Sequence, residues 1–191
     1  MKKKKSTISP ESFKKIVQAV YDLSKLPENW NKHGALQIED STIKRAIRLL
    51  HAFLYKDVLK EVDPKYFFVE RLPTDNEIEK IIAEAKKIQT KYFDDPDNTK
   101  YYWGHLHNNI TPCIKYWTMD ILPTFDGGIE FSLSAIGPMI ELTIPPYEKL
   151  PIFYRRGIVP LDKIEPEYLE ENESFDYNKI ADVVYKTVGE F

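Results

Sequence analysis

The chain has 191 residues and a formal net charge of −3; 42% of its residues are hydrophobic and 13% are aromatic. This composition excludes a disordered chain, and the length predicts one domain with its own core. Seven glycines and a single cysteine exclude collagen-like proteins and disulfide scaffolds. We therefore expect a single domain over residues 1–191, with residues 1–8 as a flexible basic tail.

Two features of the sequence predict a cytoplasmic protein. Cys113 has no second cysteine with which to form an internal disulfide, which is typical of a reducing compartment. The lysines at positions 2–5 resemble the start of a signal peptide, but a polar segment follows them instead of an apolar one. No apolar run approaches the roughly 20 residues that span a bilayer, so we expect no membrane partner.

Charge is distributed unevenly along the chain. Residues 1–60 contain 13 Lys and Arg against 6 Asp and Glu, whereas residues 161–191 contain 3 against 9. This pattern predicts either a basic tail that docks on an acidic face of the same molecule or two charged surfaces that bind a partner. Nucleic acid is a further alternative for the basic end, although such a site also needs base stacking or groove insertion.

Helical patterns occupy the first half of the chain and its end. The spacing of apolar residues predicts helices over residues 9–26 and 40–63. Thr74 and Glu77 form a capping box that begins a third amphipathic helix. Asp176 caps a last helix near the C-terminus.

From residue 101 onward the sequence favours strands. Residues 114–122 are rich in aromatic and branched side chains, and residues 152–156 form a further candidate strand. One earlier candidate strand, residues 65–71, lies among the predicted helices. Between residues 122 and 152, two alternating segments predict a hairpin with one buried face. A four-residue turn in this hairpin pairs Leu133 with Ile140, Phe131 with Leu142, and Ile129 with Ile144. Helices followed by strands and a closing helix predict an α+β fold, whose antiparallel sheet of about 4–5 strands is packed by the N-terminal helices on one face.

Two segments resemble motifs of a family of small, uncharacterised prokaryotic proteins. Residues 26–35 read LPENWNKHGA and resemble the family's LPxxWDGYGA loop. Residues 123–129 read PTFDGGI and, with the strands after them, resemble its PxxDGGIxLEW hairpin. Residues 31–33 are Asn-Lys-His where the family has Asp-Gly-Tyr, and residues 132–133 are Ser-Leu where it has Glu-Trp. The resemblance implies this fold, a domain of unknown function and an insertion over residues 63–118, and it implies no reaction.

The residues that carry the two motifs suit a structural role. Trp30 is large enough to fill the gap between two helices and a sheet. Gly34, Gly127 and Gly128 allow positive φ or close backbone approach where the chain turns. Asp126 can accept hydrogen bonds from its own turn. We expect these five residues to shape the scaffold.

His105 and His107 are the candidate metal ligands. In an extended segment both imidazoles lie on one face, as a metal pair requires. A catalytic zinc needs a third protein ligand, for which the sequence offers only candidates of unknown position: His33, Asp126, Glu130 and Glu141. A half-exposed aromatic strand with polar neighbours explains the same residues without a metal.

A pair of carboxylates and the single thiol are further catalytic candidates, and each also has an ordinary structural explanation. Glu130 and Glu141 project from the solvent side of the predicted hairpin, nearly opposite each other, and paired carboxylates do acid–base chemistry only where burial separates their pKa values. Cys113 would be a nucleophile beside a histidine, but nothing near it in sequence activates a thiolate. The sequence contains no P-loop, dinucleotide-binding fingerprint, G-x-S-x-G or H-E-x-x-H motif.

The leading hypothesis is therefore a non-catalytic, cytoplasmic α+β module that binds another macromolecule, as antitoxin, immunity and phage-defence accessory proteins do. Tyr101, Tyr102, Trp103 and Trp117 are aromatic residues that would anchor such an interface. The expected partner is another protein or a second copy of the chain, and no cofactor is expected. The alternative is a metal-dependent hydrolase or nuclease that uses His105, His107 and a divalent metal.

Overall fold

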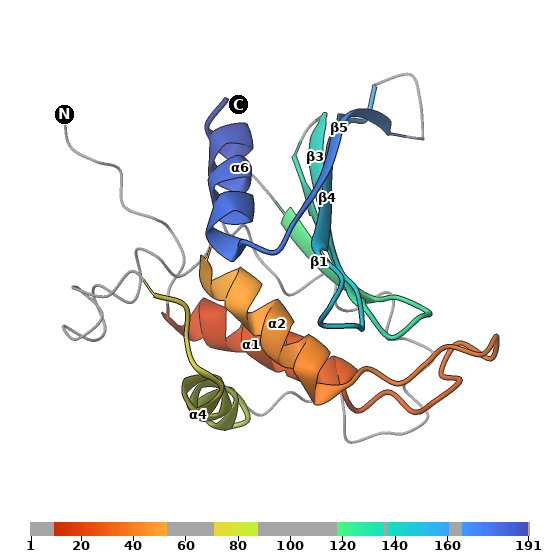
Figure 1. Cartoon of the computed structure of the whole chain (residues 1–191), viewed down its shortest axis with the longest axis vertical. Coiled ribbons are helices and arrows are strands. Elements are labelled where there is room, and N and C mark those ends of the chain that lie inside the picture. The colour runs from red at the N-terminus through yellow and green to blue at the C-terminus, as the bar shows by residue number, and fades with distance from the viewer. Residues whose placement is uncertain (1–9, 53–70, 88–117, 136, 161–165, 191) are drawn as a thin grey trace.

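The computed structural model describes residues 10–52, 71–87, 118–135, 137–160 and 166–190, and its architecture is α+β, as predicted (Figure 1). Neighbouring strands are antiparallel and follow one another across the sheet in chain order. The strands are β1 (Thr118–Pro123), β2 (Ile129–Ser134), β3 (Pro138–Ile144), β4 (Ile152–Ile158) and β5 (Glu167–Ser174). The helices are α1 (Pro10–Leu23), α2 (Asp40–Leu50), α4 (Asp75–Ala85) and the closing α6 (Tyr177–Glu190).

The described helices lie on one side of the sheet. In Figure 1 α6 runs beside the sheet, α1 and α2 cross below it, and α4 packs on the far side of α1. We call the sheet face toward these helices the inner face and the opposite one the outer face. None of the described helices is long and apolar enough to pass through a lipid bilayer.

The inner face of the β2–β3 hairpin forms the centre of the core. Ile129, Phe131 and Leu133 are buried and pair with Ile144, Leu142 and Ile140, which confirms the predicted register. Helix α2 packs on β2 and β3, whereas α1 packs against α2, α4 and β1. The buried apolar stripe of α1 consists of Phe13, Ile16, Val17, Val20 and Leu23. Because strand side chains alternate between the two faces, this register places every intervening residue on the outer face.

The capping box of α4 is also as predicted. The Thr74 backbone N–H donates to Glu77 Oε2 at 2.8 Å, and the Glu77 backbone N–H donates to Thr74 Oγ1 at 3.4 Å. Arg71 donates to both carboxylate oxygens of Glu77, at 2.7 and 2.6 Å. These hydrogen bonds, first that of Arg71 and then that of Thr74, lower the pKa of Glu77 to about 2. Arg48 on α2 also donates to the Pro73 carbonyl at 3.3 Å and to the Asp75 carboxylate, so local and distant contacts together fix the start of α4.

Several boundaries differ from the prediction or lie beyond the described residues. Helix α2 ends at Leu50, and a wider turn over residues 51–52 follows it, so the longer helix predicted to residue 63 is seen only in its first part. The strand predicted over residues 65–71 lies outside the described part except for Arg71, which is not in a strand. Strand β5 was not predicted.

A buried arginine ties α2 to the loop between β3 and β4. Arg45 is 6% exposed, and its guanidinium donates to three backbone carbonyls of that loop. The acceptors are Pro145 O at 2.8 Å, Tyr147 O at 2.9 Å and Leu150 O at 2.8 Å. Each carbonyl gains a charged donor, so one side chain holds a turn that is about one hundred residues away in sequence.

Replacing this arginine tests how far the loop depends on it. We expect Arg45→Met to lower the free energy of unfolding by about 3 kcal/mol, because hydrogen bonds to charged groups contribute roughly 1.5–3 kcal/mol each and water replaces only part of them. Lys44→Met on the same helix is the matched control, since its 2.9 Å ion pair with Glu79 is at the surface and contributes little to stability. Urea unfolding that gives equal losses for both variants would contradict this role.

His51 gives the fold a defined sensitivity to acid. It is 7% exposed, and burial lowers its pKa from 6.5 to about 4. The unfolded chain therefore binds the proton first, and stability is lost as pH falls from 6.5 towards 4. We expect His51→Gln to reduce the dependence of the unfolding free energy on pH between pH 6.5 and pH 4. Thermal melts at closely spaced pH values check this, and an unchanged slope in the variant would refute it.

Candidate functional site

A polar row crosses the outer face of the sheet through all of its strands. Asp120 on β1 is registered with Ser132 on β2, and Ser132 with Glu141 on β3. Glu141 is then registered with Arg155 on β4, and Arg155 with Glu171 on β5. Because residues in register lie side by side, these five side chains form one continuous line on the face that no described helix covers (Figure 1).

The line is organised around the Glu141 carboxylate. Both the Arg155 Nε–H and the Tyr168 hydroxyl donate to Glu141 Oε2, the hydroxyl at 3.0 Å. The Arg155 guanidinium also lies over the Tyr168 ring, 4.2 Å from its centroid. The Glu141 side chain is only 12% exposed, so this ion pair is more effective than one in open solvent. Burial, and then the hydrogen bond to Glu141, raise the pKa of Tyr168.

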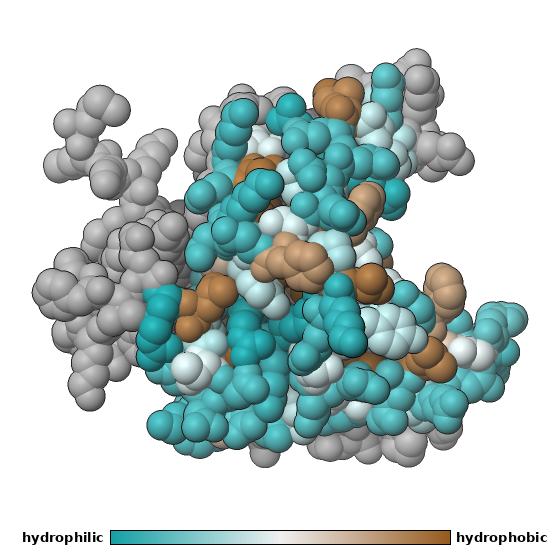
Figure 2. Space-filling model, in the orientation of Figure 1, coloured by the Kyte–Doolittle hydropathy of each residue, from teal (hydrophilic) through white to brown (hydrophobic). Residues whose placement is uncertain are grey.

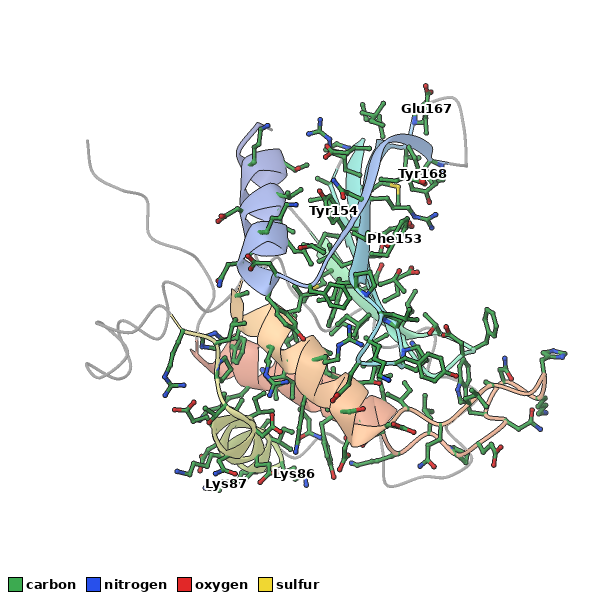
Figure 3. The ribbon with its side chains drawn as sticks, viewed as in Figure 1. Lys86, Lys87, Phe153, Tyr154, Glu167 and Tyr168 are labelled. Carbon is green, nitrogen blue, oxygen red and sulfur yellow. The ribbon has the colours of Figure 1, made fainter. Side chains whose placement is uncertain are left out.

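Tyr168 reaches Glu141 because of a bulge in the sheet edge. The register of β4 with β5 shifts between Arg156 and Gly157, which places Tyr168 opposite Gly157. A Cβ atom on Gly157 would lie 2.6 Å from the Glu167 carbonyl oxygen, so only glycine fits there. Phe153 and Tyr154 are adjacent on β4 and point to opposite faces of the sheet (Figure 3). Tyr168 is labelled in the same view.

Glu130 is the second carboxylate of this surface, and its environment differs from that of Glu141. It lies on β2, diagonally across from Glu141, and is half-buried. Among the residues that the structure describes, no group donates a hydrogen bond to it. Burial, and then the charge of Glu141, raise its pKa above 4.5. Glu130 therefore carries a carboxylate charge that is incompletely compensated and is suited to a cationic ligand.

Glu130 and Glu141 lie on the predicted face of the hairpin, although diagonally instead of opposite each other, and Glu141 is largely buried in its ion pair. Neither of the groups that hold Glu141 was predicted. Arg155 follows from strand alternation once β4 is recognised, since Ile152 and Tyr154 face the core. Tyr168 had no usable signal, because its strand contains no alternation of apolar residues.

The two predicted motif loops meet at one end of the sheet. The Leu36 backbone N–H donates to the Phe125 carbonyl at 2.8 Å, which joins the Trp30 loop to the β1–β2 turn. Gly34 and Gly127 have φ values of 85° and 88°, and a Cβ on Gly128 would lie 2.6 Å from the Ile144 carbonyl oxygen. These glycines therefore meet the backbone requirements expected of them.

The other motif side chains have local contacts in these loops. Trp30 packs, partly buried, against the core. Asp126 Oδ1 accepts hydrogen bonds from the Thr124 hydroxyl and from the Gly128 backbone N–H, the latter at 3.3 Å. Phe125, between Thr124 and Asp126, is 73% exposed. Figure 2 shows separate hydrophobic spots on an otherwise largely hydrophilic face of the molecule. The contacts of these motif side chains thus serve turn formation and packing.

The remaining candidates lie outside the described residues. These are the histidines His105 and His107, the thiol of Cys113, and the aromatic residues Tyr101, Tyr102, Trp103 and Trp117. Within the described ranges no three His, Cys, Asp or Glu side chains are placed to share a metal ion. Of the suggested third ligands, His33 is exposed on its loop and Glu141 is already bound by Arg155. The metal site stays a prediction.

Comparisons of the chain with protein-family models, with curated proteins and with solved structures find no match. The resemblance of the two motifs to a prokaryotic family therefore stays a prediction.

The raised pKa of Glu130 predicts an unusual stability effect. Its folded pKa lies above the unfolded value, so the folded protein is favoured below pH 4.5 and loses stability as pH rises through the folded pKa. We expect Glu130→Gln to raise the melting temperature at pH 7 and to have little effect at pH 4. Glu148→Gln, on an exposed loop, is the control and should change neither. Destabilisation by Glu130→Gln at pH 7 would show that the carboxylate has a stabilising partner.

Proposed function

We propose that the protein is a non-catalytic module that binds another protein through the outer face of its sheet. The observation that carries this proposal is the polar row from Asp120 to Glu171, which lies on a face that no described helix covers. Sheets in single domains bury one face and leave the other to solvent or to a partner. Here the outer face carries an ordered Arg155–Glu141–Tyr168 cluster, and Arg and Tyr are among the residue types enriched in interfaces.

The charge of the face indicates the kind of partner. Asp120, Glu130, Glu141, Glu171 and Glu173 are acidic, and Arg155 is the one base registered among them in the described strands. A surface with this excess of carboxylates attracts basic proteins and repels nucleic acid. The proposal therefore favours a protein partner over the nucleic acid considered for the N-terminal lysines.

An antitoxin, immunity or defence-accessory role in the cytoplasm agrees with this charge, because inhibitors of nucleic-acid-binding proteins present acidic surfaces to basic sites. That biological setting depends on the motif resemblance. The aromatic residues near positions 101–103 and Trp117 are proposed as additional anchors of the same interface. The metal-dependent alternative has no support from the described residues, and it depends on His105 and His107.

Site-specific photo-crosslinking tests the proposed face. A benzophenone side chain at Thr143, half-exposed at the centre of the outer face, should give a discrete crosslinked product in cells that express the protein at native level. The same group at Lys80, exposed on α4, should give none. Products from both positions, or from Lys80 alone, would contradict the proposal, and so would a lack of any product. A product of twice the chain mass would identify the partner as a second copy.

A further inference from the structure

Strand β5 forms one edge of the described sheet. Among the described strands β5 pairs only with β4, so one row of its backbone N–H and C=O groups has no strand beside it (Figure 1). The bulge at Gly157 disrupts the beginning of β5, and residues 170–174 continue in regular register with residues 152–156. A regular open edge of about five residues is long enough to accept an added strand.

The charges on this edge are only partly balanced within the molecule. Arg155 is bound to Glu141, and Arg156 Nε lies 3.2 Å from Glu170 Oε2. Glu171 and Glu173 lie two residues apart on the outer face, both exposed, and neither forms an ion pair in the described part of the chain. Because residues opposite each other on neighbouring strands interact directly, a strand added here would place two of its side chains beside these carboxylates.

The same charges disfavour pairing between two copies of the protein. In an antiparallel β5–β5 pair, the outer-face residues of one copy lie beside those of the other, so glutamates would face glutamates. Like charges directly opposite each other destabilise a sheet, and charged edges are a common protection against self-association. The edge therefore rejects a second copy and requires opposite charge in whatever pairs with it.

We propose that β5 binds an extended basic segment of another protein by strand addition along residues 170–174, with Lys or Arg at two alternate positions facing Glu171 and Glu173. This inference rests on the proposed binding function and specifies the partner's chemistry. The backbone hydrogen bonds would supply part of the affinity, and the alternation of basic residues would supply specificity.

Synthetic peptides test the pattern directly. The probe is a fluorescein-labelled alternating Lys-Thr peptide of about ten residues, and its control contains the same residues as one block of lysines and one block of threonines. We expect the alternating peptide to bind the full chain about tenfold more tightly by fluorescence anisotropy, since only it matches the strand period. Equal affinities would mean general charge attraction and would overturn the proposal, as would undetectable binding.

Backbone methylation separates strand addition from charge alone. Two further peptides carry N-methyl groups on alternate residues, one on the even and one on the odd positions. Strand addition predicts that one of them loses binding and the other keeps it, because only alternate N–H groups face β5. Equal effects of the two sets would overturn the proposal. Glu171→Gln with Glu173→Gln should weaken the alternating peptide about tenfold, whereas the exposed pair Glu28→Gln with Glu148→Gln, which makes the same charge change, should not.

Peptide binding and crosslinking together separate the edge site from the wider interface. If the alternating peptide binds only after the lysines at positions 2–5 are changed to serine, the chain's own tail occupies the edge and the proposed external partner is wrong. If crosslinking from Thr143 captures a protein but no peptide binds, the binding function stands and strand addition fails. Peptide binding without any crosslinked product would leave the edge site valid and refute the wider proposed interface.

Discussion

The arrangement of this protein depends on the register between β2 and β3. Burial of Ile129, Phe131 and Leu133 against their partners on β3 fixes which face of each strand is apolar. A slip of one residue would expose these side chains, at roughly 1.5–3 kcal/mol each, and would bury Glu130 and Glu141 in their place. The core therefore determines the position of the outer polar row, although no residue of that row belongs to the core.

The parts of the fold that were predictable depend on interactions between residues close in sequence. The hairpin has a short turn and strict alternation, so its register and the outward placement of Glu130 and Glu141 followed from the sequence. The capping box of Thr74 and Glu77 and the cap at Asp176 are similarly local. In each case the determining partners lie within about fifteen residues of one another.

The parts that were not predictable depend on partners far apart in sequence. Four of the eight residues of β5 are glutamates, which have low strand propensity, and the strand forms because β4 offers it a paired edge. Tyr168 is aligned with Glu141 only through the bulge at Gly157. Arg45 likewise lies on the buried face of α2, where it donates hydrogen bonds to carbonyls of a distant loop. Helical periodicity does not indicate this role.

Two features of the outer face are unfavourable for the isolated chain and would be relieved by the proposed cationic partner. Glu130 is already partly removed from water without a hydrogen-bond donor among the described residues, so a cationic group that binds it causes less further desolvation than it would at an exposed carboxylate. Glu171 and Glu173 repel each other along the edge, and a basic strand would relieve this repulsion while supplying backbone partners. Both arguments require the partner to be cationic. They are independent, because one concerns desolvation of a carboxylate on β2 and the other concerns charge repulsion on β5. A purely protective role for the charges accounts for the acidic edge, because charged edges prevent aggregation, but it does not account for the half-buried Glu130 in the interior of the sheet.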